Sequence, residues 1–412
     1  MADTVVKIAF DLSAAGRGDF FTLDDTTKGV LDNATYKLAG EVLTDVTADL
    51  RQLNVRRGRS SILEKFEAGA AQAVLDNRSR YYDPTAGTAI SPYAPSIKPR
   101  KQLVVEMNGQ PVFNGQVEDW DLSYTVSGDS LAVAKAADGF SLLAQQVIQP
   151  HTAIPQATGA RVAAILDRAE IAWPSGRRNI DAGLATLVGD AIGGTADPAP
   201  VNALAYLQQV EQDEPGALFV AKDGSLTFRQ RTDLQQVTAV EFTDTGIGIP
   251  FSNIAVEYGT EQLRNSVSVV RLNAGTATAE DLASQDEYGI TTYQITNSLL
   301  ADAAQAQDLA DWLVNLYGQP QLRVESVSVV MNALSVEQQN DVLGLELGDV
   351  VRVLFTPNGI GDPIDRYVAI DAIQHSVSAS LHTVQFDLSQ TIGAFVLDSA
   401  SFGILDSNVL GF

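Results

Sequence analysis

The sequence contains no cysteine and only three histidines, at positions 151, 375 and 382, and this scarcity removes several classes of site. Without cysteine there are no disulfides and no thiolate metal ligands. Three histidines are too few for a His-rich metal site. Long apolar runs are also missing: no stretch reaches the ~18 residues of a membrane-spanning helix, and the N-terminus lacks a basic region followed by a long apolar core. We therefore expect neither a membrane protein nor one exported by a signal peptide.

Basic residues are scarce as well. The chain has 27 Lys and Arg against 51 Asp and Glu, a formal net charge of −24, which argues against a nucleic-acid-binding surface. The distribution is uneven: Arg51 to Lys101 holds ten basic and four acidic residues, a local net charge of +6. This segment is either a solvated basic face or a surface that docks on an acidic neighbouring subunit.

Recognisable catalytic motifs are lacking too. The sequence has no GxSxG, HExxH, P-loop or strand-to-helix GxGxxG pattern. The most suggestive carboxylates are Glu118 and Asp119, close to Trp120 and Tyr124, but strand alternation would place Glu118 and Asp119 on opposite faces. We therefore predict that the protein is not an enzyme and has no catalytic or cofactor-binding residues.

What the sequence does contain is globular composition, with 45% hydrophobic and 19% charged residues. Strands dominate the first third, including a hairpin turned on Asn108-Gly109, and four alternating segments in the last third predict four more strands. Between them, helices are predicted at 158–171, with Thr158 as the cap, and at 201–214, followed by a hairpin on Asp223-Gly224. A further helix, ending near Gly318, has a continuous apolar face.

These signals predict a mainly β protein with an α+β insert. The proposed parts are an N-terminal arm (1–40), a first β domain (41–145), an α+β domain (146–235), a second β-rich domain with a helical insert at about 298–318 (236–390), and a C-terminal arm (391–412). At 412 residues the chain is long enough for several domains.

One pattern occurs twice, at 21–33 (FTLDDTTKGVLDN) and at 395–407 (FVLDSASFGILDS). Both copies follow F-x-L-D-x-x-x-x-G-[VI]-L-D-[NS], which we interpret as two short strands around a turn. The two copies are suited to pair with each other or, by strand addition, with equivalent edges on a neighbouring chain, and anchoring of a neighbouring protein, one copy per terminus, is an equal alternative. We predict that both copies adopt the same conformation and make inter-chain contacts. The matching apolar residues are Phe21, Leu23 and Leu31 in the first copy and Phe395, Leu397 and Leu405 in the second. A calcium site at Asp24, Asp25 and Asp32 is a lesser alternative, because the EF-hand spacing is absent.

Three neighbouring stretches resemble minor tail proteins of long-tailed bacteriophages, specifically the tail-tip or baseplate hub family: RRGRSSILEKFEAGAAQAVLDNRSRYYDP, SPYAPSIKPR and VFNGQVEDW. The family pattern is an RGR, then F-x-x-G-x-A-x-x-x-L-D-N, an aromatic-Asp-Pro and F-x-G-x-[VI]-x-x-W. Here these elements stand at 57–59, 66–77, 82–84 and 113–120. Weaker similarities lie at 203–231, 265–320 and 345–355.

The resemblance implies a multi-domain structural protein with tube-like β-barrel domains. Such hubs are similar to trimers that join the tail tube to the tip, around a channel through which viral DNA passes without sequence-specific binding. The implied partners are a distal-tail or tail-tube ring, the tape-measure protein, and tail fibres or other tip proteins. The implied location is the virion tail tip, after synthesis in the host cytoplasm. Because this sequence shows no fibre or peptidoglycan-cutting module, we expect no lysin or fibre role.

Two alternatives stay open: a six-fold distal-tail adaptor ring and a receptor- or polysaccharide-binding tail protein. Aromatic content of only 7% weighs against the latter. Candidate inter-subunit contacts are the apolar residues of the two repeats and five arginines, Arg56, Arg57, Arg59, Arg78 and Arg80. We expect Trp120, Trp173 and Trp312 to be core residues, and His375 and His382 to be hydrogen-bonded strand residues.

Overall fold

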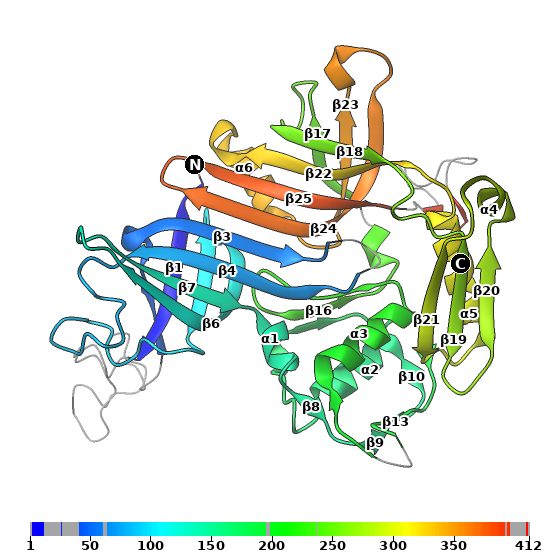
Figure 1. Cartoon of the computed structure of the whole chain (residues 1–412), viewed down its shortest axis with the longest axis horizontal. Coiled ribbons are helices and arrows are strands. Elements are labelled where there is room, and N and C mark those ends of the chain that lie inside the picture. Colours follow the sequence, from blue (N-terminus) through cyan, green and yellow to red (C-terminus); the bar gives the residue numbers. More distant parts are fainter. Residues whose placement is uncertain are drawn as a thin grey trace.

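A single large sheet joins the two β-rich parts of the chain (Figure 1). The computed structural model describes residues 2–11, 41–60, 64–194, 198–235 and 237–391, together with Thr26 and the short strands β26 (Ala394–Phe395) and β27 (Val409–Leu410). Along the sheet the strands run β18 (Asn253–Tyr258), β22 (Leu322–Val330), β25 (His382–Gln390), β24 (Ile364–Ser378), β3 (Leu50–Gly58), β4 (Glu67–Asp76), β7 (Ser130–Ala137), β6 (Gln110–Tyr124), β5 (Gln102–Met107), β1 (Thr4–Asp11) and β2 (Glu41–Asp45). The sheet has 13 strands, because β23 (Val350–Phe355) pairs with β24 and carries β17 (Val237–Thr243).

The seam of this sheet is the antiparallel pair of β3 and β24, in which Gly58 lies opposite Ala372. It joins segments that are more than three hundred residues apart in the sequence. The first and second β regions are therefore continuous in one sheet, with no break between them. The division of the chain into five parts stays a prediction, with one difference. Residues 4–11, assigned to the N-terminal arm, form strand β1 inside the sheet, because Val6 and Ile8 are fully buried there.

The α+β insert lies below the sheet in Figure 1. It contains α1 (Gly139–Leu143), α2 (Thr158–Leu166), α3 (Ala203–Asp213) and a three-stranded sheet of β11 (Arg178–Ile180), β16 (Leu226–Arg229) and β15 (Ala217–Val220). Three short strand pairs complete it: β8 (Val147–Ile148) with β14 (Val201–Asn202), β9 (His151–Thr152) with β13 (Ala191–Ile192), and β10 (Gln156–Ala157) with β12 (Thr186–Leu187). An isolated bridge joins Leu187 of β12 to Leu300, outside the insert. The insert shares one hydrophobic core with the large sheet.

A second, smaller core lies under the longest helix. Here β19 (Ser266–Arg271), β20 (Thr276–Glu280) and β21 (Thr292–Ser298) form a sheet flanked by α4 (Leu282–Tyr288) and α5 (Ala303–Tyr317). The predicted apolar face of α5 is confirmed, since Leu309, Leu313 and Leu316 are buried against this sheet. The remaining helix is α6 (Val336–Gly344), which begins with a capping box at Ser335. Among the described residues, no helix is long and apolar enough to cross a membrane.

The predicted turns are confirmed, and one predicted cap is wrong. Asn108 (φ 49°) and Gly109 (φ 74°) both adopt the positive φ that a two-residue hairpin requires between β5 and β6. Asp223-Gly224 likewise turns β15 into β16. Thr158, however, does not cap α2: it is the first helical residue, and its hydroxyl donates to the carboxylate of Glu214 instead. The Thr158 hydroxyl, which the local sequence predicts to cap the helix, is therefore bound by a carboxylate that is distant in the sequence.

Most of the terminal repeat lies outside the described residues, including Phe21, Leu23, Leu31, Leu397 and Leu405. Of the C-terminal copy (395–407), Phe395 is described: it belongs to β26 (Ala394–Phe395), which pairs in parallel with β27 (Val409–Leu410), beyond the copy. A tight hairpin would make such a pair antiparallel, so this pair is not the one that we predicted. The proposed calcium ligands Asp24, Asp25 and Asp32 also lie outside the described part of the chain.

Candidate functional site

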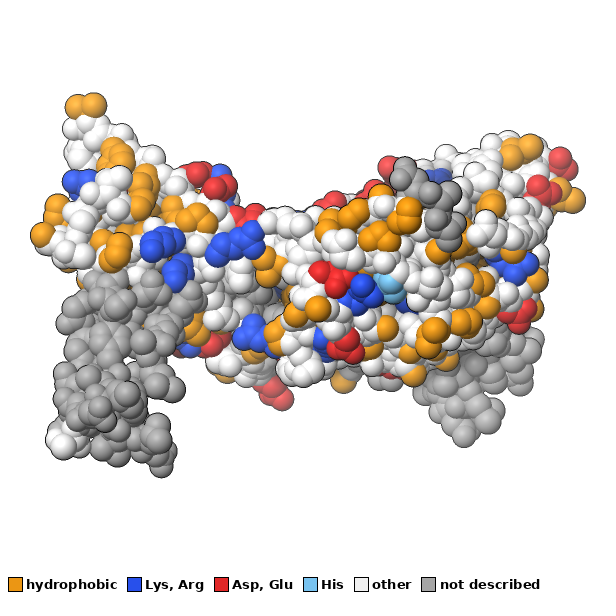
Figure 2. Space-filling view, turned by 90° about the horizontal axis from the view of Figure 1, so that it is seen from below, with side chains coloured by type: hydrophobic (Ala, Val, Ile, Leu, Met, Phe, Trp, Pro, Cys, Tyr) orange, Lys and Arg blue, Asp and Glu red, His pale blue; other side chains and the backbone are white. Residues whose placement is uncertain are grey.

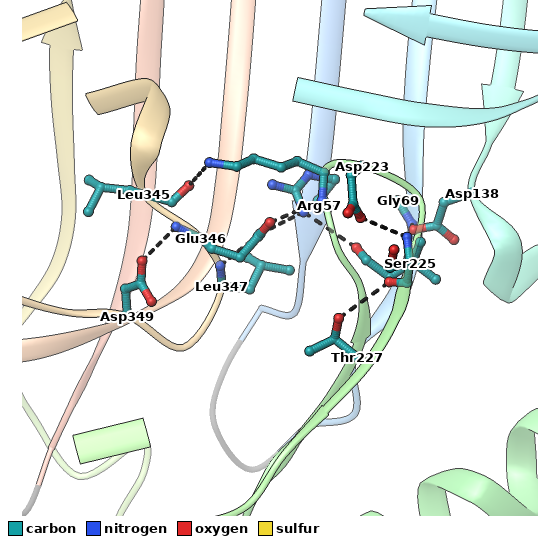
Figure 3. Close-up of polar contacts among 12 residues, drawn as sticks. Arg57, Gly69, Asp138, Asp223, Ser225, Thr227, Leu345, Glu346, Leu347 and Asp349 are labelled. Atoms are coloured by element: carbon teal, nitrogen blue, oxygen red, sulfur yellow. Dashed lines mark hydrogen bonds and ion pairs between the residues drawn. The ribbon is translucent and has the colours of Figure 1, made fainter. Parts of the chain in front are cut away.

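The RGR sequence ends β3 at the point where the first β region, the insert and the second β region meet. Arg57 and Arg59 are buried, with exposed fractions of 4% and 7%. Arg57 donates from Nη1 to Oε1 of Glu346 at 2.7 Å and to the carbonyl of Val220 at 3.4 Å (Figure 3). One guanidinium therefore ties β3 both to the β15–β16 hairpin and to the loop before β23.

The carboxylate of Glu346 is the centre of this buried network. It accepts hydrogen bonds from the backbone N–H groups of Lys222 at 3.0 Å and Leu347 at 2.9 Å, in addition to Arg57. Burial alone would raise the pKa of Glu346, but the charge of Arg57 and these hydrogen bonds outweigh it, so the pKa lies below its usual value. Glu346 is therefore ionised at neutral pH, with Arg57 and two backbone N–H groups of the same chain as its partners.

Lys222 provides a second link across the same junction. Its Nζ donates to the carbonyls of Leu343, Gly344 and Leu345 at 2.8, 2.7 and 3.3 Å, at the C-terminal end of α6. These carbonyls carry the negative end of the helix dipole, which favours a cation there. The backbone N–H of Glu346 in turn donates to Asp349 at 2.8 Å, as Figure 3 shows. The hairpin of the insert is thus fixed to the second β region by one ammonium and one carboxylate.

Gly58 and Arg59 form the seam itself. Arg59 donates from Nε to Asp371 at 2.9 Å, and its guanidinium lies 4.4 Å from the centre of the Phe66 ring. Gly58 has φ +122°, and a Cβ placed there would lie 2.1 Å from the backbone oxygen of Asp371 and 2.5 Å from Cα of Ala372. Only glycine fits between these two arginines.

A buried carboxyl also connects β4 with the start of α1. Asp138 caps α1 by accepting from the N–H of Phe140 at 2.9 Å, and it accepts from the N–H of Gly69 at 2.7 Å (Figure 3). Burial raises the pKa of Asp138 to about 7, although both hydrogen bonds and the charge of Arg57 oppose the rise.

The basic segment 51–101 is largely neutralised by the chain's own carboxylates. Besides the pairs made by Arg57 and Arg59, there are ion pairs of Arg51 with Asp76 and Asp129, Arg56 with Asp387, Arg78 with Asp76, and Arg80 with Asp83. In the view from below, Lys and Arg side chains gather mostly over the left half, which is the first β region (Figure 2). We assign Arg57 and Arg59 an intramolecular role and keep Arg56, Arg78 and Arg80 as proposed subunit contacts.

The other residues singled out from the sequence are dispersed. Trp120, Trp173 and Trp312 are half-buried and pack against the two cores. Glu118 and Asp119 are both exposed, because a β-bulge after Val117 interrupts the alternation of β6. No group of three or more potential ligands that could hold a metal ion occurs in the part of the chain that the structure describes.

The two strand histidines lie against each other inside the sheet. His375 Nδ1 and His382 Nε2 are 3.3 Å apart, on the neighbouring strands β24 and β25. Burial lowers the pKa of both, that of His382 to about 4, and the proximity of the two rings lowers that of His375 further. Both rings are therefore neutral at pH 7.

A cavity of about 150 Å³ lies beside this junction, between α3 and α5. Glu211 of α3 lines it and is buried; Oε1 accepts from the N–H of Leu218 at 3.1 Å, while Oε2 has no hydrogen-bond partner. Burial raises the pKa of Glu211 to about 7. Its ionised form is therefore costly near neutral pH.

Glu211→Gln is expected to increase the free energy of unfolding at pH 8 by on the order of 1–3 kcal/mol, with little change at pH 4. A carboxyl whose pKa is raised on folding loses stability as the pH rises from its unfolded value to about 7, and glutamine removes that loss. Urea unfolding at both pH values checks this. Glu337→Gln, at an exposed position of α6, is the control, and an equal gain at pH 4 and pH 8 would contradict the prediction.

Solved structures share this fold. The 43 kDa tail protein of prophage MuSo2 from Shewanella oneidensis matches 95% of this chain and 97% of its own, at 13% identity and a TM-score of 0.57. The tail protein from Neisseria meningitidis MC58 matches 85% of this chain and 93% of its own, at 13% identity and a TM-score of 0.55. No protein-family model and no curated protein matches the sequence. The chain has the fold of phage tail proteins, which confirms the predicted fold class.

Sequence reasoning missed the acidic half of the junction. Glu346 stands in LELGDVVRVLF, a stretch that indicated only a strand, and Asp371 stands in the middle of a predicted strand. The available signal was a charged residue inside an otherwise apolar strand pattern, since such a residue is buried only with a partner. Nothing in the residue pattern indicates which arginine that partner would be.

Proposed function

We propose that this chain is a structural protein of a bacteriophage tail, forming a trimeric hub at the distal end. In that position it links the tail tube to the tip and forms part of the wall of the DNA channel. The observation that carries the proposal is the end-to-end likeness to a phage tail protein of nearly equal length. An appended domain or a local motif would not produce a match over 95% of one chain and 97% of the other.

Two features of the chain support the finer assignment. Each copy carries two β regions, so three copies would present six to a six-fold tube ring. The net charge of −24 suits a channel wall along which DNA slides without binding. The proposed neighbours are a tail-tube or distal-tail ring, the tape-measure protein and other tip proteins. The proposed role is non-enzymatic, and we propose that the protein resides in the virion.

Native mass spectrometry of the purified chain is expected to give a species of three times 43.9 kDa. A species of six copies would instead favour the distal-tail adaptor ring. Because we propose that the terminal repeats act between subunits, deletion of 391–412 is expected to convert the trimer largely to monomer. Recovery of intact, infectious tails from a phage carrying this deletion would contradict that role for the repeat.

A further inference from the structure

Strand β18 (Asn253–Tyr258) is an outer edge of the large sheet. Among the described residues it pairs with β22 alone, and none of them donates a backbone or side-chain hydrogen bond to its outward side. In Figure 1 it lies at the upper side of the sheet, beyond β22. Lys and Pro, two residues that protect natural edges from pairing, are absent from the sequence NIAVEY, and Glu257 is its one charged residue.

The two faces of this edge differ in chemistry. Ile254, Val256 and Tyr258 alternate along one face, where Val256 is 36% and Tyr258 is 68% exposed. Glu257 points to the other face, opposite Arg323 of β22. A strand added here would therefore meet apolar side chains on one face and a carboxylate on the other.

That carboxylate belongs to a crowded acidic group. Glu325 stands in a bulge of β22, where the register shifts between Ala255 and Val256, and the proximity of Glu257 raises the pKa of Glu325. Arg323 pairs with Glu257, its Nη2 lying 3.4 Å from the carboxylate. The stretch of sequence that contains β18, residues 251–320, has nine acidic and two basic residues, a net charge of −7. An incoming cation would be favoured on this face.

We propose that β18 accepts, by strand addition, an extended segment of another protein in which apolar and basic residues alternate. The apolar residues extend the surface of Val256 and Tyr258, the basic residues face Glu257 and Glu325, and the outward backbone groups of β18 complete the ladder. This proposal is independent of the trimeric hub, because it concerns an edge that a monomer also exposes.

A second copy of this chain does not supply the required basic residues at any of the three edge strands of the large sheet, since β18 (NIAVEY), β17 (VTAVEFT) and β2 (EVLTD) all lack Lys and Arg. Full-length antiparallel pairing of β18 with a second β18 would place Glu257 opposite Ile254, so it would bring no basic residue to Glu257 or Glu325. The opposite edge, β2, reads Glu-Val-Leu-Thr-Asp and is acidic as well. The partner is therefore a different protein.

The test uses two short capped peptides, one alternating valine with lysine and one alternating valine with glutamate. Binding is measured by fluorescence anisotropy, and the site is located by amide hydrogen exchange. The valine–lysine peptide is expected to bind roughly fivefold or more tightly than the valine–glutamate peptide and to protect the amides of 253–258. Glu257→Lys is expected to reverse this preference, whereas Glu337→Lys, an exposed charge reversal on α6, should leave it unchanged.

Three results would overturn the proposal. The first is equal binding of a peptide with the same composition in which the valines and lysines form separate blocks, since this would indicate general charge attraction. The second is protection at residues other than 253–258. The third is self-association of the chain that Glu257→Lys abolishes, because the occupant would then be a second copy.

Discussion

Gly58→Ala is expected to lower the free energy of unfolding by more than about 4 kcal/mol, although it only adds one methyl group and removes no interaction. Gly58 has φ +122°, which costs an L-residue roughly 1–3 kcal/mol. The added Cβ would also lie 2.1 Å from the backbone oxygen of Asp371. Because β3 and β24 pair at this position, relief requires the seam of the sheet to open.

Urea unfolding followed by circular dichroism measures this effect. Gly128→Ala is a matched control, because Gly128 also has a positive φ, +90°, but nothing lies within 4 Å of its virtual Cβ. The control is expected to cost only about 1–2 kcal/mol. If the losses in free energy of unfolding of the two variants differ by less than about 1 kcal/mol, then the close contact with Asp371 is not the reason that position 58 requires glycine.

Arg57→Met is expected to destabilise the protein by roughly 3–5 kcal/mol, because it leaves the buried carboxylate of Glu346 without its cation. The side chains of Arg57 and Glu346 have exposed fractions of 5% and 11%, so solvent cannot replace the lost charge. The charge of Arg57 also keeps the pKa of Glu346 low, so its removal should raise that pKa. The loss should therefore be greater at pH 8 than at pH 5, where Glu346 of the variant can be protonated.

A double-mutant cycle with Glu346→Gln separates the ion pair from other effects. The double variant is expected to lose less free energy of unfolding than the two single variants lose together, since each single change leaves its buried partner unpaired. Arg78→Met is the control: Arg78 is 62% exposed in its pair with Asp76, and its loss should cost less than about 1 kcal/mol. Additive losses in the cycle would show that Arg57 and Glu346 act independently.

If the hub proposal is correct, Gly58→Ala and Arg57→Met should both impair tail assembly, although neither residue is a proposed subunit contact. The Arg57 network fixes the insert to both β regions, so its loss would let the three parts move relative to one another. The RGR pattern that carried the resemblance to tail-tip hubs thus has an internal structural role in this chain. Substitution of Arg56, which is 39% exposed, tests the subunit-contact role separately.

Local chemistry was enough to predict many elements. The turns at Asn108-Gly109 and Asp223-Gly224 follow from residues that tolerate positive φ, and α5 follows from its apolar spacing. Each of these depends on neighbours within a few residues. The failures have the opposite character: Thr158 hydrogen-bonds to Glu214, which is 56 residues away, instead of capping its own helix.

The sequence by itself determined the class of the fold, most strands and helices, and the excess of negative charge, because these depend on periodicity, turn chemistry and composition. Only the tertiary structure determined which buried arginine pairs with which carboxylate. Arg57 and Glu346 are 289 positions apart, and Arg59 and Asp371 are 312 apart, so no spacing rule could have paired them. Burying an arginine requires a partner, but which carboxylate meets it depends on how β3 and β24 align in the completed sheet.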